Sequence, residues 1–197
     1  MSDSVIPLRR ADRSDVSDQA LLDSCARGDN LALQELFQRH ADRVHGFLIR
    51  TRCVDGKDLD DLVQTTFLAV QRSAKQYDAR SSVNTWILGI AMNIMRQYLR
   101  SERRRREAML EVAELPRAPG DNGPHDQVAH RQELERLQRR FNSLPSKLRI
   151  VFTLIDLEGM SGGEAARLLG VREGTVWSRL HLAREALRES IAREGGT

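Results

Sequence analysis

Five polar residues share one face of a predicted helix and suit binding to a polyanion. They are Asn93, Arg96, Gln97, Arg100 and Arg104. Their spacing of three or four residues, with one adjacent pair, is that of a single helix face. The chain then continues into four consecutive arginines that end at Arg106. Guanidinium groups pair with phosphate oxygens, and side-chain amides can hydrogen-bond the edges of bases. The pattern equally fits a solvated helix end whose arginines favour the negative C-terminal dipole, so the flanking sequence must decide between these readings.

An amphipathic helix is predicted to position these side chains. Its apolar residues recur at steps of three and four between Ser82 and Arg106. They are Val83, Trp86, Ile87, Ile90, Ala91, Ile94 and Tyr98. A polar loop at 77–82 comes before this helix.

Three more helices are expected ahead of that loop. The first is capped by Ser17 or Asp18 and stops at Gly28, and the second is capped by Asp29 or Asn30. The second continues to about residue 50, and the third runs from about residue 58 to 70. Three aspartates in the third helix's first turn suit its positive N-terminal dipole. Four helices joined by short loops, without alternating segments, predict an all-α bundle.

After residue 106 the sequence changes character. The segment 107–127 is rich in proline and glycine and reads as a flexible linker between two small helical domains. Helical periodicity returns near Val128, and Pro145 fits the first turn of a further helix. The β-branched run 150–155 also keeps helical spacing and is therefore assigned to a helix.

The C-terminal part has the layout of a helix-turn-helix. Ser161 and Glu164 have the spacing of a capping box at the start of a short helix that ends at Gly170. The next helix begins near Arg172 and places polar side chains along its first half, which is the half that enters the major groove in this motif. An ordinary helical hairpin is the alternative. The combination of capping box, glycine turn and polar leading edge favours DNA binding.

Composition narrows the possible classes further. The chain has 197 residues and a net charge of +3, with aspartates gathered near its N-terminus and arginines at 96–106 and 131–149. Such a split suggests one surface for protein and another for nucleic acid. Cys25 and Cys53 form no CxxC pair and are read as small buried thiols, and no metal or other cofactor is predicted. The sequence has no apolar run of membrane-spanning length and no signal peptide, so we expect a soluble cytoplasmic protein.

Several motifs resemble bacterial RNA polymerase sigma factors of the extracytoplasmic-function (ECF) type, which keep only regions 2 and 4. The segment 60–67, DDLVQTTF, is similar to the D-[DE]-L-V-Q-E-T-F signature of region 2. Trp86-Ile87, Ile90-Ala91, Asn93 and Arg100 match the spaced pattern of its promoter-melting helix. Leu144-Pro145, the segment 149–152, Glu158-Gly159, the segments 164–166 and 169–171, and EGTVWSRL at 173–180 match region 4 and its helix-turn-helix.

The resemblance implies four segments: a frayed tail at 1–17, region 2 at 18–106, a linker at 107–127 and region 4 at 128–197. Region 2 would bind the core polymerase through Asp58, Asp61, Leu62, Gln64, Thr65 and Leu68. It would bind the melted minus-ten element through Arg80, Ser81, Ser82, Trp86, Asn93, Arg96, Gln97, Arg100, Arg103 and Arg104. Region 4 would read the minus-thirty-five element through Arg172, Glu173, Thr175, Trp177, Ser178, Arg179, His181 and Arg184.

The implied function is a non-catalytic transcription initiation factor. Its partners would be the clamp of the largest polymerase subunit, the flap of the second-largest subunit, promoter DNA and an anti-sigma factor. Three positions depart from the family pattern: Thr65 replaces an acidic residue, Gln97 an aspartate, and Trp177 a lysine. The last change removes a candidate phosphate contact.

Two other classes of protein would account for part of the sequence. A stand-alone DNA-binding regulator accounts for the helix-turn-helix, but it leaves the predicted helix at 58–70, with its aspartates in the first turn, without a role. An enzyme such as a nuclease would need clustered carboxylates or histidines, whereas Asp58, Asp60 and Asp61 diverge at a helix start.

Overall fold

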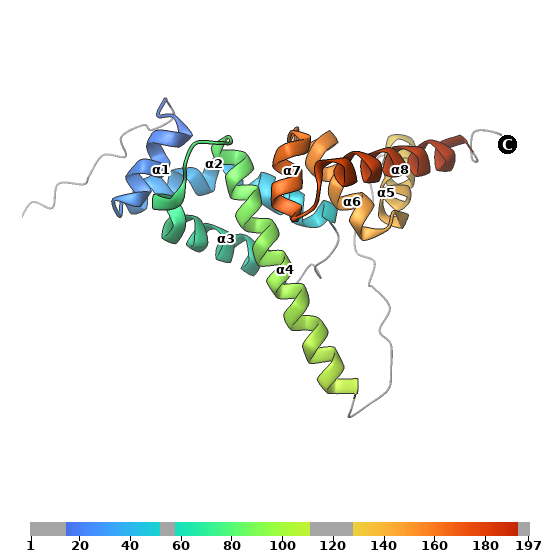
Figure 1. Ribbon diagram of the computed structural model, residues 1–197, viewed down its shortest axis with the longest axis horizontal. Coiled ribbons are helices and arrows are strands. Elements are labelled where there is room, and N and C mark those ends of the chain that lie inside the picture. Colours follow the sequence, from blue (N-terminus) through green and yellow to red (C-terminus); the bar gives the residue numbers. More distant parts are fainter. Residues whose placement is uncertain (1–14, 52–57, 111–127, 193–197) are drawn as a thin grey trace, which may run out of the picture.

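The computed structural model describes residues 15–51, 58–110 and 128–192, and over these residues the chain is helical, without strands. The helices are α1 (Asp18–Ala26), α2 (Asn30–Thr51), α3 (Leu59–Ser73), α4 (Val83–Leu110), α5 (Val128–Ser143), α6 (Ser146–Phe152), α7 (Gly162–Leu169) and α8 (Glu173–Ala192). A 3-10 turn, η2 (Ala74–Gln76), follows α3, and a π-helical turn, η3 (Thr153–Leu157), extends α6. The predicted all-α class is confirmed (Figure 1).

The first two helices begin as the sequence predicts. The Ser17 hydroxyl accepts from the amide of Ala20 at 3.3 Å and caps α1, and the Asp29 carboxylate accepts from Leu31 and Ala32 at 2.9 and 3.2 Å. Gly28, between the two helices, has a φ of 93°, a conformation that side-chain-bearing residues rarely adopt.

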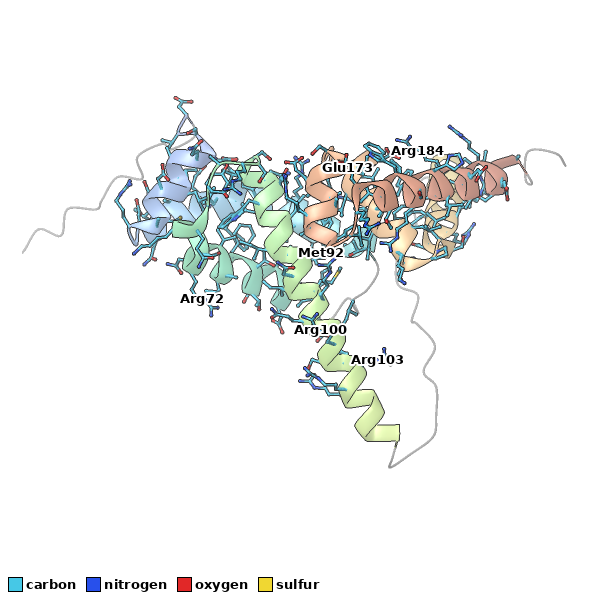
Figure 2. The ribbon with its side chains drawn as sticks, viewed as in Figure 1. Arg72, Met92, Arg100, Arg103, Glu173 and Arg184 are labelled. Carbon is cyan, nitrogen blue, oxygen red and sulfur yellow. The ribbon has the colours of Figure 1, made fainter. Side chains whose placement is uncertain are left out.

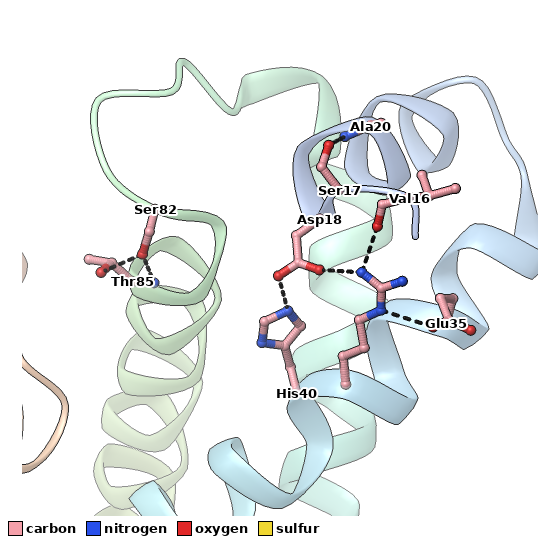
Figure 3. A network of polar contacts seen from close by, with 9 residues as sticks. Val16, Ser17, Asp18, Ala20, Glu35, His40, Ser82 and Thr85 are labelled. Atoms are coloured by element: carbon pink, nitrogen blue, oxygen red, sulfur yellow. Dashed lines mark hydrogen bonds and ion pairs between the residues drawn. The ribbon is translucent and has the colours of Figure 1, made fainter. Parts of the chain in front are cut away.

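A polar network ties the start of α1 to α2 (Figure 3). The Asp18 carboxylate lies 2.7 Å from His40 Nε2 and accepts from Arg39 Nη1 at 2.9 Å. Arg39 also donates to Glu35 at 2.9 Å and to the carbonyl of Val16 at 2.7 Å. This network positions α1 against α2, on which α3 and α4 then pack.

The buried face of α4 differs in part from the prediction. Val83, Ile87 and Ala91 are buried as expected, and Leu88, Met92 and Met95 are buried beside them. Trp86, Ile90, Ile94 and Tyr98 are only partly buried. The reason is that α4 packs against α1, α2 and α3 and also contacts α7 near Gly89 and Arg96, so its apolar surface is wider than one stripe. The helix also runs to Leu110, four residues into the predicted linker, and 111–127 lies outside the described residues.

The two predicted domains pack against each other. One continuous cluster of buried apolar side chains includes residues of α1–α4 together with residues of α6, α7 and α8. In Figure 1, α7 lies beside the first half of α4, whose second half extends beyond the other helices. The run 150–155 is helical as predicted, spanning the end of α6 and the start of η3.

Candidate nucleic-acid interface

The helix-turn-helix has the local geometry that the sequence predicts. Ser161 Oγ accepts from the Glu164 amide at 3.3 Å, and Glu164 Oε2 accepts from the Ser161 amide at 2.9 Å, which completes the capping box. Gly170 ends α7 with a φ of 65°, the left-handed conformation that favours glycine. The capping box and Gly170, both within residues 161–170, therefore determine where α7 begins and where the turn to α8 starts.

Replacing Ser161 with alanine is expected to destabilise this motif by about 1 kcal/mol, because the Glu164 amide loses its side-chain acceptor and the Glu164 carboxylate loses the hydrogen bond from the Ser161 hydroxyl. Urea unfolding followed by circular dichroism would measure the loss. Ser178→Ala is a suitable control, since the Ser178 hydroxyl bonds only back to the carbonyl of Gly174 within its own helix, at 2.8 Å. Equal midpoints for the two variants would contradict the capping assignment.

The first half of α8, together with Arg172 just before it, presents most of the predicted upstream-element residues to solvent. Arg172, Glu173, Trp177, Ser178 and His181 are exposed, whereas Thr175 and Arg179 are half-buried. Val176, Leu180 and Ala183 are buried on the opposite face, whereas Leu187 is only half-buried.

Trp177 and Arg184 make contacts within region 4 that the sequence did not reveal. Trp177 Nε1 donates to Glu173 at 3.2 Å, and its ring lies so close to Gly162 that an added Cβ would approach it to 2.6 Å. Arg184 donates twice to Asp156, at 3.0 and 2.5 Å, and this hydrogen bonding raises the pKa of its guanidinium. Arg184 thus joins α8 to η3, and a DNA phosphate would have to compete with Asp156 for it.

Most polar side chains on this face of α4 are exposed to solvent, but one of them contacts region 4. Asn93, Gln97, Arg100, Arg103 and Arg104 are exposed. Figure 2 places Arg100 and Arg103 on the half of α4 that extends beyond the other helices. Arg96, in contrast, is half-buried, and its Nη1 donates to the Leu168 carbonyl at the end of α7, at 2.8 Å. Burial, and then the charge of Arg100, lower the pKa of Arg96.

The loop before α4 is ordered by its own side chains. The Tyr77 hydroxyl donates to the Ser81 carbonyl at 2.6 Å, and the Tyr77 ring meets Trp86 edge to face at a centroid distance of 5.5 Å. Ser82 Oγ accepts from the Thr85 amide at 3.1 Å and caps α4 (Figure 3). Arg80 pairs with Asp78 at 3.1 Å and is otherwise open to solvent. Ser81 and Trp86, both predicted to touch promoter DNA, are thereby held beside each other.

The residues predicted to bind core polymerase separate into two groups. Asp61, Gln64, Thr65 and Leu68 are exposed at the i, i+3, i+4 and i+7 positions of one face of α3. Leu62 is only 7% exposed and packs in the core, so its side chain is not accessible for the predicted contact with polymerase. Asp58 is half-buried and accepts from the Tyr98 hydroxyl at 2.6 Å, which joins the start of α3 to α4.

A small pocket lies where α4 meets α7. Its walls come from both regions: Ser81, Thr85, Trp86, Gly89, Ile90 and Asn93 on one side, and Met160, Glu164, Arg167 and Leu168 on the other. Leu168 approaches Gly89 closely enough that a Cβ there would lie 3.6 Å from its Cδ1. The first helix of the helix-turn-helix therefore covers the side of α4 that carries Trp86.

No group of three or more metal-ligating side chains comes together in the parts of the chain that the structure describes. Cys25 is buried, and Cys53 lies outside the described residues. None of the described helices has the length and apolarity needed to cross a membrane.

Comparison with known proteins identifies the family. Residues 36–105 match Sigma-70 region 2, and residues 134–187 match Sigma-70 region 4. The chain is 32% identical over 187 residues to the ECF RNA polymerase sigma-E factor of Haemophilus influenzae, covering 89% of this chain and 96% of that one. The chain belongs to the ECF sigma factor family.

Other similar proteins agree with this assignment. The ECF RNA polymerase sigma factor SigE of Mycolicibacterium smegmatis is 35% identical over 173 residues, which cover 85% of this ECF sigma factor and 66% of that relative's length. The structure of CnrH in complex with the cytosolic domain of CnrY matches with a TM-score of 0.61 and 26% identity, over 91% of this chain and 99% of that one. The sigma factor RpoE of Bartonella quintana, solved in complex with the anti-sigma factor NepR, shares the fold at 22% identity, with a TM-score of 0.63 and coverage of 81% and 96%.

Proposed function

We propose that this ECF sigma factor is a non-catalytic initiation subunit with its three tasks on three helices. In this proposal, α3 binds core RNA polymerase, the loop 77–82 and α4 hold the melted minus-ten element, and α8 reads the minus-thirty-five element. The observation that carries the proposal is the exposed amide and arginine stripe of α4, which occurs in the same chain as an exposed helix-turn-helix.

The exposed face of α3 suits a protein partner. Leu68 is 51% exposed beside Asp61, Gln64 and Thr65, so an apolar side chain is surrounded by polar ones. Interfaces commonly have this composition, with an apolar centre and a polar rim. We assign the largest-subunit clamp to this face of region 2, and the second-largest-subunit flap to region 4.

The α4 stripe suits single-stranded DNA. Its exposed arginines can hold the backbone, Asn93 and Gln97 can bond to base edges, and the nearby aromatic pair Tyr77 and Trp86 offers a surface for a base. Extruding a base costs a few kcal/mol, which hydrogen bonds in a pocket can offset.

Arg179→Ala is expected to weaken binding of the holoenzyme to the upstream element roughly tenfold, since a guanidinium contact to a base contributes about 1–3 kcal/mol. Gel-shift titration of the holoenzyme on a duplex with the upstream element would measure this. Arg188→Ala is the matched control, because Arg188 is exposed on the later part of α8. If the two variants bound equally well, Arg179 would not be a reading residue.

We place the action of the protein in the bacterial cytoplasm and propose an anti-sigma factor as a further partner. The similar fold of an RpoE bound to the anti-sigma factor NepR supports a partner of this kind. A stand-alone DNA-binding regulator remains the second candidate, because region 4 alone would serve it. Gel filtration with core polymerase separates the two: co-elution supports the initiation subunit, and separate elution favours the regulator.

A further inference from the structure

A carboxylate from region 4 is buried between two arginines of region 2. The Glu158 side chain, just after η3, is 1% exposed. Arg43 Nε donates to its Oε2 at 2.8 Å, and Arg50 Nη2 donates to its Oε1. Arg43 also donates to the Glu158 main-chain carbonyl at 3.3 Å. Since an ionised carboxylate is stable in such a place only while it is paired, these contacts hold the two regions together only as long as all three side chains stay in place.

Two other arginines cross the same boundary. Arg149, on α6 and 7% exposed, donates to the Thr51 carbonyl at the end of α2, at 3.2 Å. Arg96 on α4 donates to the Leu168 carbonyl on α7. Below these bonds the apolar core runs from one region into the other.

This closed arrangement covers part of the proposed minus-ten surface. The guanidinium of Arg96 is already bonded to α7, and Trp86 and Asn93 line a pocket whose other wall includes Glu164. A DNA strand entering there would have to displace the Leu168 carbonyl from Arg96 and the α7 side chains, Glu164 and Arg167 among them, that line the other wall. The closed chain and the DNA strand therefore compete for the same side chains.

Distance leads to the same conclusion. The minus-ten and minus-thirty-five elements lie about 25 base pairs apart, which is more than two helical turns, or about 80 Å at roughly 34 Å per turn. In the structure, α7 of the helix-turn-helix contacts α4 directly. Both elements can be bound at once only after region 4 has left region 2.

We propose that Glu158, clamped by Arg43 and Arg50, is a latch that keeps the free chain closed and withholds the minus-ten surface from DNA. The proposal rests on the proposed function in its assignment of that surface. Because only the open fraction binds, the apparent affinity for single-stranded DNA is lowered in proportion to that fraction. Opening the latch must then raise the affinity without any new contact to DNA.

The test uses the full chain without polymerase and a fluorescent single-stranded oligonucleotide that carries the minus-ten element. The double variant Arg43→Gln/Arg50→Gln leaves Glu158 unpaired, so region 4 should move away and let the carboxylate hydrate. We expect at least fivefold tighter binding, although two positive charges are lost and simple electrostatics predicts weaker binding. Glu158→Gln, which changes the region 4 side of the same contact, should also tighten DNA binding.

Arg72→Gln is the matched control, because Arg72 is an exposed arginine of region 2 that donates to the Leu68 carbonyl of its own helix, at 3.1 Å. It should bind DNA no more tightly than the unaltered chain. Small-angle scattering gives a readout independent of DNA: the radius of gyration should increase in both latch variants and not in Arg72→Gln. Because the arginines are on the solvent-facing side of α2, the double variant tests the latch even if Glu158→Gln fails to fold.

Unchanged affinity and unchanged radius in the double variant would overturn the latch. If the radius increases but neither the free chain nor the holoenzyme binds the oligonucleotide, the latch stands and the proposed minus-ten role of α4 fails. If the holoenzyme binds the oligonucleotide and the latch variants bind no more tightly than the unaltered chain, the minus-ten role stands and the competition with DNA is refuted.

Discussion

Replacing Leu68 with aspartate is expected to weaken assembly with core RNA polymerase strongly. Leu68 is 51% exposed at the end of the face formed by Asp61, Gln64 and Thr65 on α3. If this face is covered by the clamp, the substitution removes an apolar contact and buries a charge without a partner. Apolar interface residues that are buried on binding can contribute 2 kcal/mol or more, so the affinity should fall at least about 30-fold.

Anisotropy titration of labelled chain with core polymerase would measure the effect. Ile191→Asp is the matched control: Ile191 is 49% exposed, near the end of α8 and away from α3, and receives the same change. The fold should survive both changes, because neither side chain is buried. Equal affinities of the two variants would show that polymerase binds elsewhere.

Reversing the charge of Arg100 is expected to impair promoter melting strongly while sparing upstream-element binding. Arg100 is exposed on the stripe that carries Asn93 and Gln97. Arg100→Glu replaces a phosphate partner with a repelling carboxylate. A charge-assisted hydrogen bond contributes about 1.5–3 kcal/mol, which predicts a roughly 10- to 100-fold loss of open complex.

Permanganate reactivity of thymines in the minus-ten region would report the melted fraction. Arg27→Glu serves as the control with the same charge change, on the exposed C-cap of α1. For the bound single strand, we also expect the salt dependence to weaken by about 0.7 in log–log slope for the lost phosphate contact. Full melting by Arg100→Glu with an unchanged salt slope would remove Arg100 from the DNA surface.

Local features of this chain could be read from its sequence because their causes are local. The Ser17, Asp29 and Ser161 caps and the Gly170 turn each depend on residues within one helical turn, and the structure confirms them. The family resemblance, in contrast, did not separate Leu62, which is buried, from the exposed side chains of Asp61, Gln64 and Thr65 in the same motif.

Long-range features could not be read in this way. Arg43 and Arg50 are seven residues apart and so share a face of α2, but their partner Glu158 is more than a hundred residues further along the chain. The contact between Arg96 and Leu168 and that between Arg184 and Asp156 also join separate elements. Sequence periodicity describes one helix at a time, so it assigned the whole α4 stripe to DNA and missed the covering by α7.

This ECF sigma factor directs core RNA polymerase to promoters. Run-off transcription with purified chain, core polymerase and promoter fragments of the source genome tests this role most directly. We expect promoter-specific product only when both proteins are present, and loss of that product with Leu68→Asp. Normal binding of the chain to promoter DNA without any binding to core polymerase would contradict the claim and favour a stand-alone regulator.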